Sequence, residues 1–323
     1  MIARFIKSPQ ARSIALFAVS SFAATLLAKI LITRLFFDYP IVIMMIQMAA
    51  SLFLIELLRV CNLVKLQPYT FDKGRHMFLP STLLSVSSWL AVSSYEGIGL
   101  PLFDPIKRLT PLLIIIFGVI FFKRPRPERS ALFAVAAVSF ASSLAVNFEY
   151  SMDRFSLCYG LIGAVFHAIA FIQIENLSSS YSALEMTYMH SFNSLVLFLI
   201  ADIVQDEIRD AFMYIMTSSN VVFFSFFLFL TGAGVIMQFA TFYSVVEAGG
   251  LTTSVVANAR AAFQTLAAFA FSWFLFYDLY PGMLNWLAFL AASAAFLVFL
   301  RRHAFNGGYE RVHQNGAEWG QKC

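Results

Sequence analysis

The sequence predicts an all-α membrane protein with ten transmembrane helices arranged as two inverted five-helix repeats. Three observations lead to this prediction: the composition, the distribution of basic residues along the chain, and a short internal repeat. Of the 323 residues, 60% are hydrophobic and only 12% are charged, whereas a soluble domain keeps about a quarter of its residues charged. A chain this apolar needs lipid on most of its sides, so the lipid bilayer is its first predicted partner.

Ten apolar segments approach the length of about 20 residues that a transmembrane helix needs. The first is predicted to be a retained span, because no signal-peptide cleavage site follows it. Turn-forming residues separate the later ones, as at Asp38-Tyr39-Pro40, Gly99-Leu100-Pro101, Lys123 to Pro127, Gly249-Gly250 and Tyr280-Pro281. The predicted spans are 13–36, 40–58, 77–98, 102–122, 130–148, 157–176, 183–204, 221–246, 251–276 and 281–300.

The basic residues test this count and orient the spans. The N-terminus, the loops from even to odd spans and the C-terminus together hold fifteen of the 22 Lys and Arg residues. The opposite side holds only Arg34, Arg154 and Arg209. Since positive residues are retained on the cytosolic side, both termini are predicted to be cytosolic and the number of spans even.

An internal repeat divides the ten spans into two fives. Glu96-Gly-Ile-Gly-Leu100 precedes Lys107-Arg108, and Glu247-Ala-Gly-Gly-Leu251 precedes Asn258-Ala-Arg260 at similar spacing. A five-span unit duplicated in tandem must insert upside down the second time, as in secondary carriers with a site between their halves. The predicted parts are a cytosolic segment 1–12, a first repeat 13–148, a second repeat 149–300 and a polar cytosolic tail 301–323.

Four cations lie inside predicted spans: Lys29, Lys107, Arg108 and Arg260. Each costs about 2.5–3.5 kcal/mol at a span centre on insertion scales. The acids fall near span ends, and Asp104, at helical spacing from Lys107 and Arg108, cannot neutralise both. Snorkelling of Lys29 toward the interface is the alternative to a buried role. The net positive interior predicts an anionic, phosphate-bearing substrate.

Uncharged polar residues inside the spans could complete a binding site. Amide side chains can read a base edge or sugar hydroxyls, although bridging helices is an equally available role. Tyr188 and Tyr243 could stack on a base, and His190 is predicted to donate or accept a hydrogen bond in the pocket, whereas His167 packs between helices. The intramembrane amides are Gln47, Gln173, Gln238, Gln264, Asn193 and Asn258.

Several function classes are excluded by absent motifs. The chain has no phosphate-binding glycine loop, nucleophile elbow or metalloprotease histidine pair, so it is predicted not to be an enzyme and to hold no cofactor. Its three cysteines have neither disulfide nor metal-ligand spacing, so no metal is expected. The net charge of +4 arises from loops that face the cytosol, so it does not indicate a nucleic-acid partner.

Four segments, in order along the chain, resemble the nucleotide-sugar transporters of the drug/metabolite transporter superfamily. Lys29 stands before Ile-Leu-Ile-Thr33, and Gln47-Met-Ala-Ala50 lies in the second span. Gly99-Leu-Pro-Leu-Phe103 with Lys107-Arg108-Leu-Thr110 looks like the family's Leu-Pro-Met-Phe and basic-pair segment. Leu251-Thr-Thr-Ser-Val-Val256 before Arg260 is similar to its Leu-Thr-Thr-Thr block and following Lys, although Ala261 replaces the family's Asn.

The resemblance implies exchange of a nucleotide sugar for the nucleoside monophosphate across the Golgi or endoplasmic reticulum membrane. Tyr188-Met-His190-Ser-Phe-Asn193 departs from the Phe-Tyr-Asn-Asn motif of the GDP-mannose branch, so the UDP-sugar branch is the nearer one. Two alternatives stay open: a carrier of a smaller phosphorylated metabolite in the same fold, and a non-transporting scaffold or regulator. A homodimer is also left open. The predicted substrate-binding residues are Lys29, Gln47, Lys107, Arg108, Thr110, Tyr188, His190, Asn193, Gln238, Tyr243, Asn258, Arg260 and Gln264.

Overall fold

A computed structural model describes residues 8–94, 103–146, 154–218, 220–270 and 282–301. In this part of the chain the structure consists of helices without any strand. Residues 302–323 of the predicted tail 301–323 and the Glu96–Leu100 half of the internal repeat lie outside the described residues. The helices are α2 (Pro9–Thr33), α3 (Pro40–Val60), α4 (Phe71–Ser93), α5 (Phe103–Lys107), α6 (Thr110–Ile120), α7 (Arg129–Val146), α8 (Arg154–Leu177), α9 (Ala183–Gln205), α10 (Glu207–Ser218), α11 (Val221–Ala248), α12 (Gly250–Ala270) and α14 (Met283–Phe299).

Helix occurs within each of the ten predicted spans, and capping chemistry explains several boundaries. Helix α2 begins earlier than predicted because Ser8 accepts a hydrogen bond from the Ala11 amide at 3.2 Å and Pro9 takes the first helical position. A capping box at Ser182 and Glu185 starts α9. The apolar segments therefore predict the helices, and the caps determine where each begins.

The predicted fourth span, 102–122, is broken in its middle rather than continuous. Helix α5 ends at Lys107, a turn follows at Arg108 and Leu109, and α6 begins at Thr110. Pro111 explains the break, because a proline lacks an amide hydrogen and its ring clashes with the carbonyl four residues earlier. The Thr110 hydroxyl instead donates to the Lys107 carbonyl at 2.6 Å. The break places Arg108 in a turn inside the bundle.

Helix α10 was not predicted, because its amphipathic sequence lacks the length and apolarity of a span. Glu207 at its start accepts a hydrogen bond from the backbone amide of Ile41, at the beginning of α3, at 2.8 Å. Tyr214 donates to the carbonyl of Leu35, in the turn after α2. An amphipathic helix of this kind suits the membrane interface, and its side chains tie the ends of α2 and α3 together.

Burial raises the pKa of Glu207 from its usual 4.5 to about 6, although the amides of Ile41 and Val42 favour the carboxylate. A raised pKa in the folded state means that the stability contributed by Glu207 is present in full below about pH 4.5 and is lost as the pH rises through about 6. We expect Glu207→Gln to shrink the fall in melting temperature between pH 5 and pH 7.5, as measured by thermal unfolding in detergent. A pH dependence equal to that of the wild type would contradict this.

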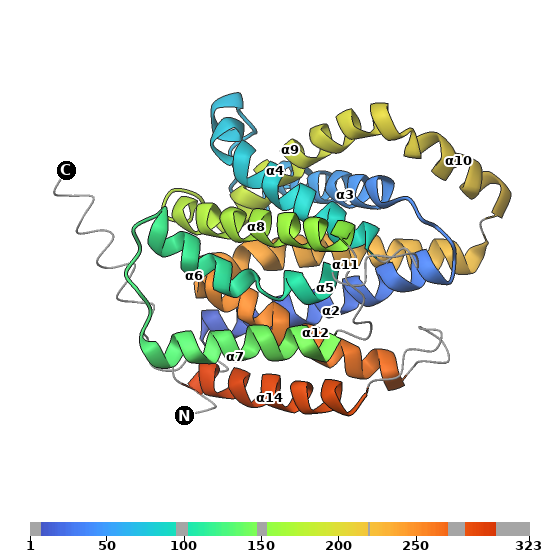
Figure 1. Ribbon diagram of the computed structural model, residues 1–323. Coiled ribbons are helices and arrows are strands. Elements are labelled where there is room, and N and C mark those ends of the chain that lie inside the picture. The colour runs from blue at the N-terminus through green and yellow to red at the C-terminus, as the bar shows by residue number, and fades with distance from the viewer. Residues whose placement is uncertain (1–7, 95–102, 147–153, 219, 271–281, 302–323) are drawn as a thin grey trace.

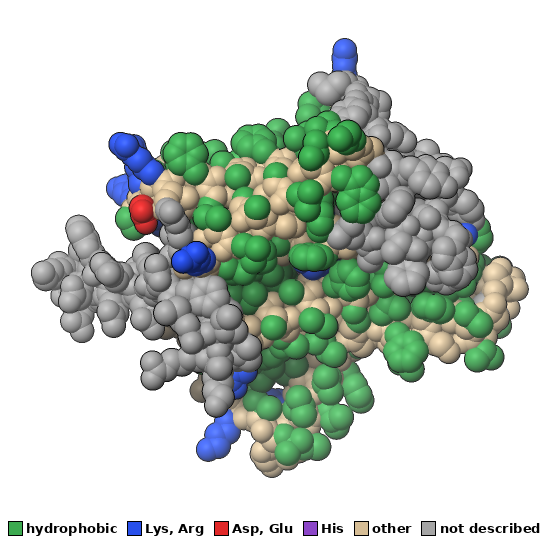
Figure 2. Space-filling view, turned by 90° about the horizontal axis from the view of Figure 1, so that it is seen from below, with side chains coloured by type: hydrophobic (Ala, Val, Ile, Leu, Met, Phe, Trp, Pro, Cys, Tyr) green, Lys and Arg blue, Asp and Glu red, His purple; other side chains and the backbone are tan. Residues whose placement is uncertain are grey.

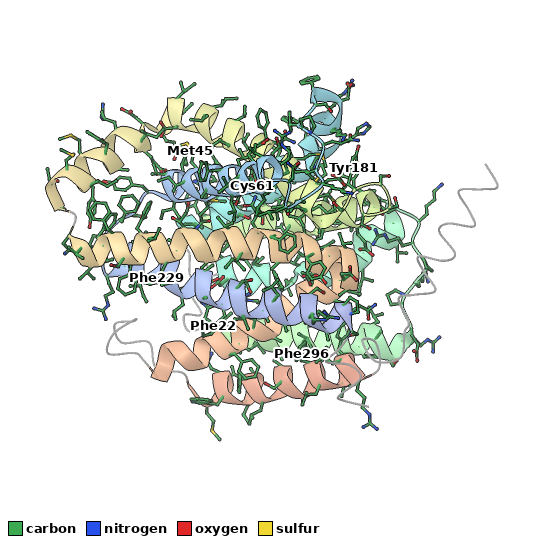
Figure 3. The ribbon with its side chains drawn as sticks, turned by 180° about the vertical axis from the view of Figure 1, so that it is seen from behind. Phe22, Met45, Cys61, Tyr181, Phe229 and Phe296 are labelled. Atoms are coloured by element: carbon green, nitrogen blue, oxygen red, sulfur yellow. The ribbon has the colours of Figure 1, made fainter. Side chains whose placement is uncertain are left out.

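The chain is a multi-pass α-helical membrane protein. Among the described residues, six helices are long and apolar enough to cross a membrane, namely α2, α3, α7, α8, α9 and α11, and α14 is a shorter apolar helix. Large hydrophobic side chains remain exposed on the outside, as Phe229 does on α11 (Figure 3). Figure 2 shows many hydrophobic side chains on the face of the molecule that is seen from below. The count of ten spans stays a prediction.

The most extensive helix contacts join the first five predicted spans to the second five. Helix α11 packs along α2 (Figures 1 and 3), α4 packs on α8, α3 on α9 and α7 on α14. The bundle has two ends, the Arg124 end and the Glu207 end. At the Arg124 end lie the C-terminal ends of α6 and α8 and the N-terminal end of α12. At the Glu207 end lie the turn between α2 and α3 and helix α10.

Candidate functional site

The structure brings together the four cations that the sequence places inside the spans. Lys29 of α2 interacts electrostatically with Arg108 and with Arg260 of α12. Lys107 interacts with the same two arginines. Helices from both halves of the chain therefore contribute to one group, called here the cation cluster: Lys29, Lys107, Arg108 and Arg260.

One acid lies within the cation cluster. Asp104 of α5 interacts electrostatically with all four of its cations, and its nearest ion pair is with Arg108, at 3.5 Å between Oδ1 and Nη2. With every group ionised, four positive charges face one negative charge. Gathering like charges in a low-dielectric interior is unfavourable, so the arrangement favours a bound anion.

Arg108 stands at the break between α5 and α6 and is almost completely buried, with 9% of its surface exposed. Its Nε has no hydrogen-bond partner among the described residues. Its carbonyl accepts a hydrogen bond from the Asn258 amide of α12 at 2.7 Å, which joins the two halves at the break. A buried donor without a partner is unusual, and an acceptor oxygen of a ligand would satisfy it.

Arg260 points from α12 toward α2. Its Nη1 donates to the Thr25 hydroxyl at 2.8 Å, to the Ser21 carbonyl at 3.3 Å and to the Gln264 side chain at 2.9 Å. The Gln264 Nε2 is buried and lacks a hydrogen-bond partner in the described structure. The predicted site residues Asn258 and Gln264 thus lie on the same helix as Arg260 of the cation cluster, whose guanidinium can bind phosphate oxygens in pairs.

Lys107 faces α4 and its own helix. Its Nζ lies 3.4 Å from the Ser87 carbonyl and 5.5 Å from the centre of the Phe103 ring. Thr110 uses its hydroxyl to close the turn after Lys107, so in this conformation it shapes the break rather than facing a ligand.

Gln47 and Gln238 lie in a separate polar group between α3, α9 and α11. Gln238 accepts from the Ser51 hydroxyl at 2.7 Å and donates to the Ser191 hydroxyl at 2.9 Å. Gln47 packs against Gly234, where a Cβ would lie 2.3 Å from its Cδ. Both amides therefore bridge helices here, and their contact with a substrate stays a prediction.

Tyr188 and Asn193 are held by the first half of the chain. The Tyr188 hydroxyl donates to Glu56 of α3. Asn193 accepts from the Tyr69 hydroxyl at 2.9 Å and donates to the Gly74 carbonyl at 3.0 Å. These bonds tie α9 to α3 and α4, and a substrate role for either residue would require them to open.

His190 and Tyr243 are packed against neighbouring side chains. The His190 ring lies 5.2 Å from the ring of Phe242, and its Nδ1 lies 3.2 Å from the Ser194 hydroxyl. Tyr243 stacks on Phe239, with ring centres 5.7 Å apart. Their predicted roles in substrate binding are untested by these contacts. No group of three or more metal-ligating side chains is found in the described part of the chain.

An ion pair that sequence reasoning missed joins the helices at the Arg124 end. Arg124, after α6, pairs with Glu175 of α8 at 2.8 Å, and Glu175 also accepts from the Gly250 amide at the start of α12 at 3.2 Å. Glu175 is only 6% exposed. Arg124 donates further to Asn176 at 2.7 Å. In the sequence these residues stand apart, in a loop and at a span end, and no local pattern links them.

Comparison with known proteins agrees with the predicted resemblance. The chain is 26% identical over 269 residues to UDP-galactose/UDP-glucose transporter 7 of Arabidopsis thaliana, a match that covers 80% of this chain and 81% of that protein. It is 22% identical over 181 residues to a Dictyostelium discoideum protein named as a UDP-sugar transporter, covering 55% of this chain and 47% of the other. No family model matches the chain.

A protein of known crystal structure has a similar fold. The two are 11% identical in sequence, the alignment covers 89% of this chain and 97% of that one, and the TM-score is 0.62. At this identity the likeness concerns the fold alone. It indicates that the arrangement of helices described here is one that an experimentally determined protein also adopts.

Proposed function

We propose that this chain, whose relatives are nucleotide-sugar transporters, carries a UDP-sugar from the cytosol into the Golgi lumen in exchange for the nucleoside monophosphate. The observation that carries the proposal is the cation cluster, in which both halves of the chain direct positive charge at one place. The relatives are transporters, in agreement with the prediction that the chain is not an enzyme. The endoplasmic reticulum is the alternative membrane.

The cation cluster suits a diphosphate better than a neutral sugar. Arg108 and Arg260 supply planar guanidinium groups that can each hold two phosphate oxygens, and Lys107 and Lys29 supply point charges. The Nε of Arg108 and the Nε2 of Gln264, which have no hydrogen-bond partner among the described residues, are donors that a ligand could satisfy. The phosphates would then lie between the α5–α6 break and α12.

The helix contacts support the predicted inverted repeats. If α2 to α7 and α8 to α14 are two copies of one unit, the first helix of each copy packs on the third of the other, as α2 on α11 and α8 on α4. The second helices, α3 and α9, pair with each other, as do the last, α7 and α14. Such reciprocal pairing is expected of two halves related by a two-fold axis.

Alternating access in this proposal opens one end of the bundle while the other stays closed. The Arg124–Glu175 pair and the Tyr188–Glu56 bond close the end that the basic residues predict to be cytosolic. Opening that end admits the nucleotide sugar, and rocking of the halves releases it at the Glu207 end. The monophosphate returns because an empty group of partly buried cations, with Arg108 almost fully buried, is costly, which favours exchange.

Uptake by the purified, reconstituted protein tests the substrate. Proteoliposomes preloaded with UMP would be offered a panel of radiolabelled nucleotide sugars. We expect uptake of one or more UDP-sugars, stimulated by internal UMP and inhibited by external UMP. Weak competition by UMP and strong competition by a triose or pentose phosphate would contradict the proposal and favour a carrier of smaller phosphorylated metabolites. Uptake that is indifferent to internal UMP would contradict exchange.

A further inference from the structure

We propose that Asp104 is a built-in counter-anion of the cation cluster, which the substrate's phosphate displaces on binding and which returns when the phosphate leaves. The inference rests on the proposed function, since it concerns the same site. It assigns Asp104 a role in setting affinity and release rather than in holding the substrate.

The position of Asp104 is the first observation. It interacts with Lys29 of α2, with Lys107 and Arg108 beside it, and with Arg260 of the second half of the chain. In the described part of the chain it is the acid with which both lysines of the cluster interact. A carboxylate that pairs with Arg108 and attracts the other three cations of a proposed phosphate site lies where the phosphate itself would bind.

The looseness of its ion pair is the second observation. The Asp104–Arg108 separation of 3.5 Å exceeds that of the Arg124–Glu175 pair, at 2.8 Å. The Asp104 side chain is 38% exposed, against 6% for Glu175. Charge-assisted hydrogen bonds are normally shorter than 3 Å. Asp104 is therefore held by charge without being locked in place, as a displaceable group must be.

The chemistry of the two anions explains the exchange. A carboxylate has one negative charge and two oxygens, whereas a phosphate has up to two charges and three terminal oxygens, so the phosphate satisfies more of the donors. While the phosphate is bound, Asp104 repels it at short range, which weakens affinity and favours release. After release, Asp104 neutralises part of the buried charge that would otherwise stand uncompensated.

A purely structural role for Asp104 makes a different prediction. Its spacing of four residues from Arg108 would allow it simply to stabilise the short helix α5. Removing such a pair would lower stability, with affinity and turnover falling together or not at all. If Asp104 is a counter-anion, its removal instead raises the affinity for the substrate and lowers the turnover.

The test measures UMP binding and UDP-sugar uptake in Asp104→Asn, with Asp104→Ser as a second variant and gel filtration to verify folding. We expect UMP to bind roughly tenfold more tightly, the order expected for removing one negative charge near the ligand, and the maximal uptake rate to fall severalfold. Asp104→Glu restores both. Glu128→Gln, which changes an exposed acid before α7, leaves both unchanged.

Unchanged or weaker UMP binding in folded Asp104→Asn and Asp104→Ser, with a wild type that binds and transports, overturns the role of Asp104 alone. A wild type that binds no UMP and takes up no UDP-sugar overturns the proposed function and this inference with it. The Asp104 variants thus test the role of Asp104, and the wild-type protein in the same experiment tests the proposed function.

Discussion

Arg260→Ala is expected to abolish UDP-sugar uptake. Arg260 is the cation that the second half of the chain adds to the cluster, and Thr25 and Ser21 of α2 hold it toward α2. Each hydrogen bond to a charged group contributes about 1.5–3 kcal/mol, so the loss of two such bonds to phosphate lowers affinity by about a hundredfold or more. The measurements are UMP binding and uptake by the reconstituted variant.

Two further variants make the Arg260 result specific. Arg260→Lys keeps the charge but loses the paired donors, so we expect affinity between those of the wild type and Arg260→Ala. Arg209→Ala is the matched control, because Arg209 is an arginine of α10 whose side chain is 70% exposed, far from the cation cluster in sequence. It should transport as the wild type does. Undiminished uptake by Arg260→Ala would instead favour a scaffold or another binding site.

Arg124→Ala is expected to destabilise the Arg124 end, which the proposed transport cycle requires to be closed. The substitution leaves the Glu175 carboxylate buried without its ion-pair partner, and breaking a buried pair costs about 3–5 kcal/mol. We expect a melting temperature lower by several degrees in detergent. We also expect faster labelling, by a membrane-impermeant thiol reagent, of a cysteine introduced at Thr253 in a variant whose three native cysteines are replaced by serine. Thr253 is buried about one turn inside the start of α12.

Arg126→Ala is the control for the Arg124 variant, because Arg126 is an exposed arginine two residues further along the same loop. It should change neither the melting temperature nor the labelling rate. Labelling of Thr253→Cys that is equally slow in the Arg124→Ala background would show that the ion pair does not keep this end closed.

Much of the fold could be predicted from the sequence, because apolar length and turn residues are local properties. Pro40 and Gly249 mark helix ends that the structure confirms. The break at Arg108 could not be separated from a continuous span, although Pro111 in the middle of an apolar segment was its available signal. Helix α10 was not predicted because a short amphipathic segment between two spans lacks the long apolar stretch that identifies a transmembrane helix.

The charged residues of the site could be predicted from the sequence, whereas the roles of its amide residues could not. A charge inside a span is costly wherever it points, so Lys29, Arg108 and Arg260 could be selected from the sequence, and the structure brings them together. The hydrogen bonds of an amide inside a span can be made by many neighbouring groups, so its role depends on which residues surround it. Gln238 illustrates this, since Ser51 and Ser191 come from helices remote in sequence.

A structure of the protein with bound UMP tests most directly whether the cation cluster is the substrate site. We expect the phosphate to lie between the α5–α6 break and α12, within hydrogen-bond distance of Arg108 and Arg260, with Asp104 turned away from Arg108. A nucleotide bound elsewhere, with the Asp104–Arg108 pair intact and neither arginine in contact with the phosphate, would contradict the proposed site.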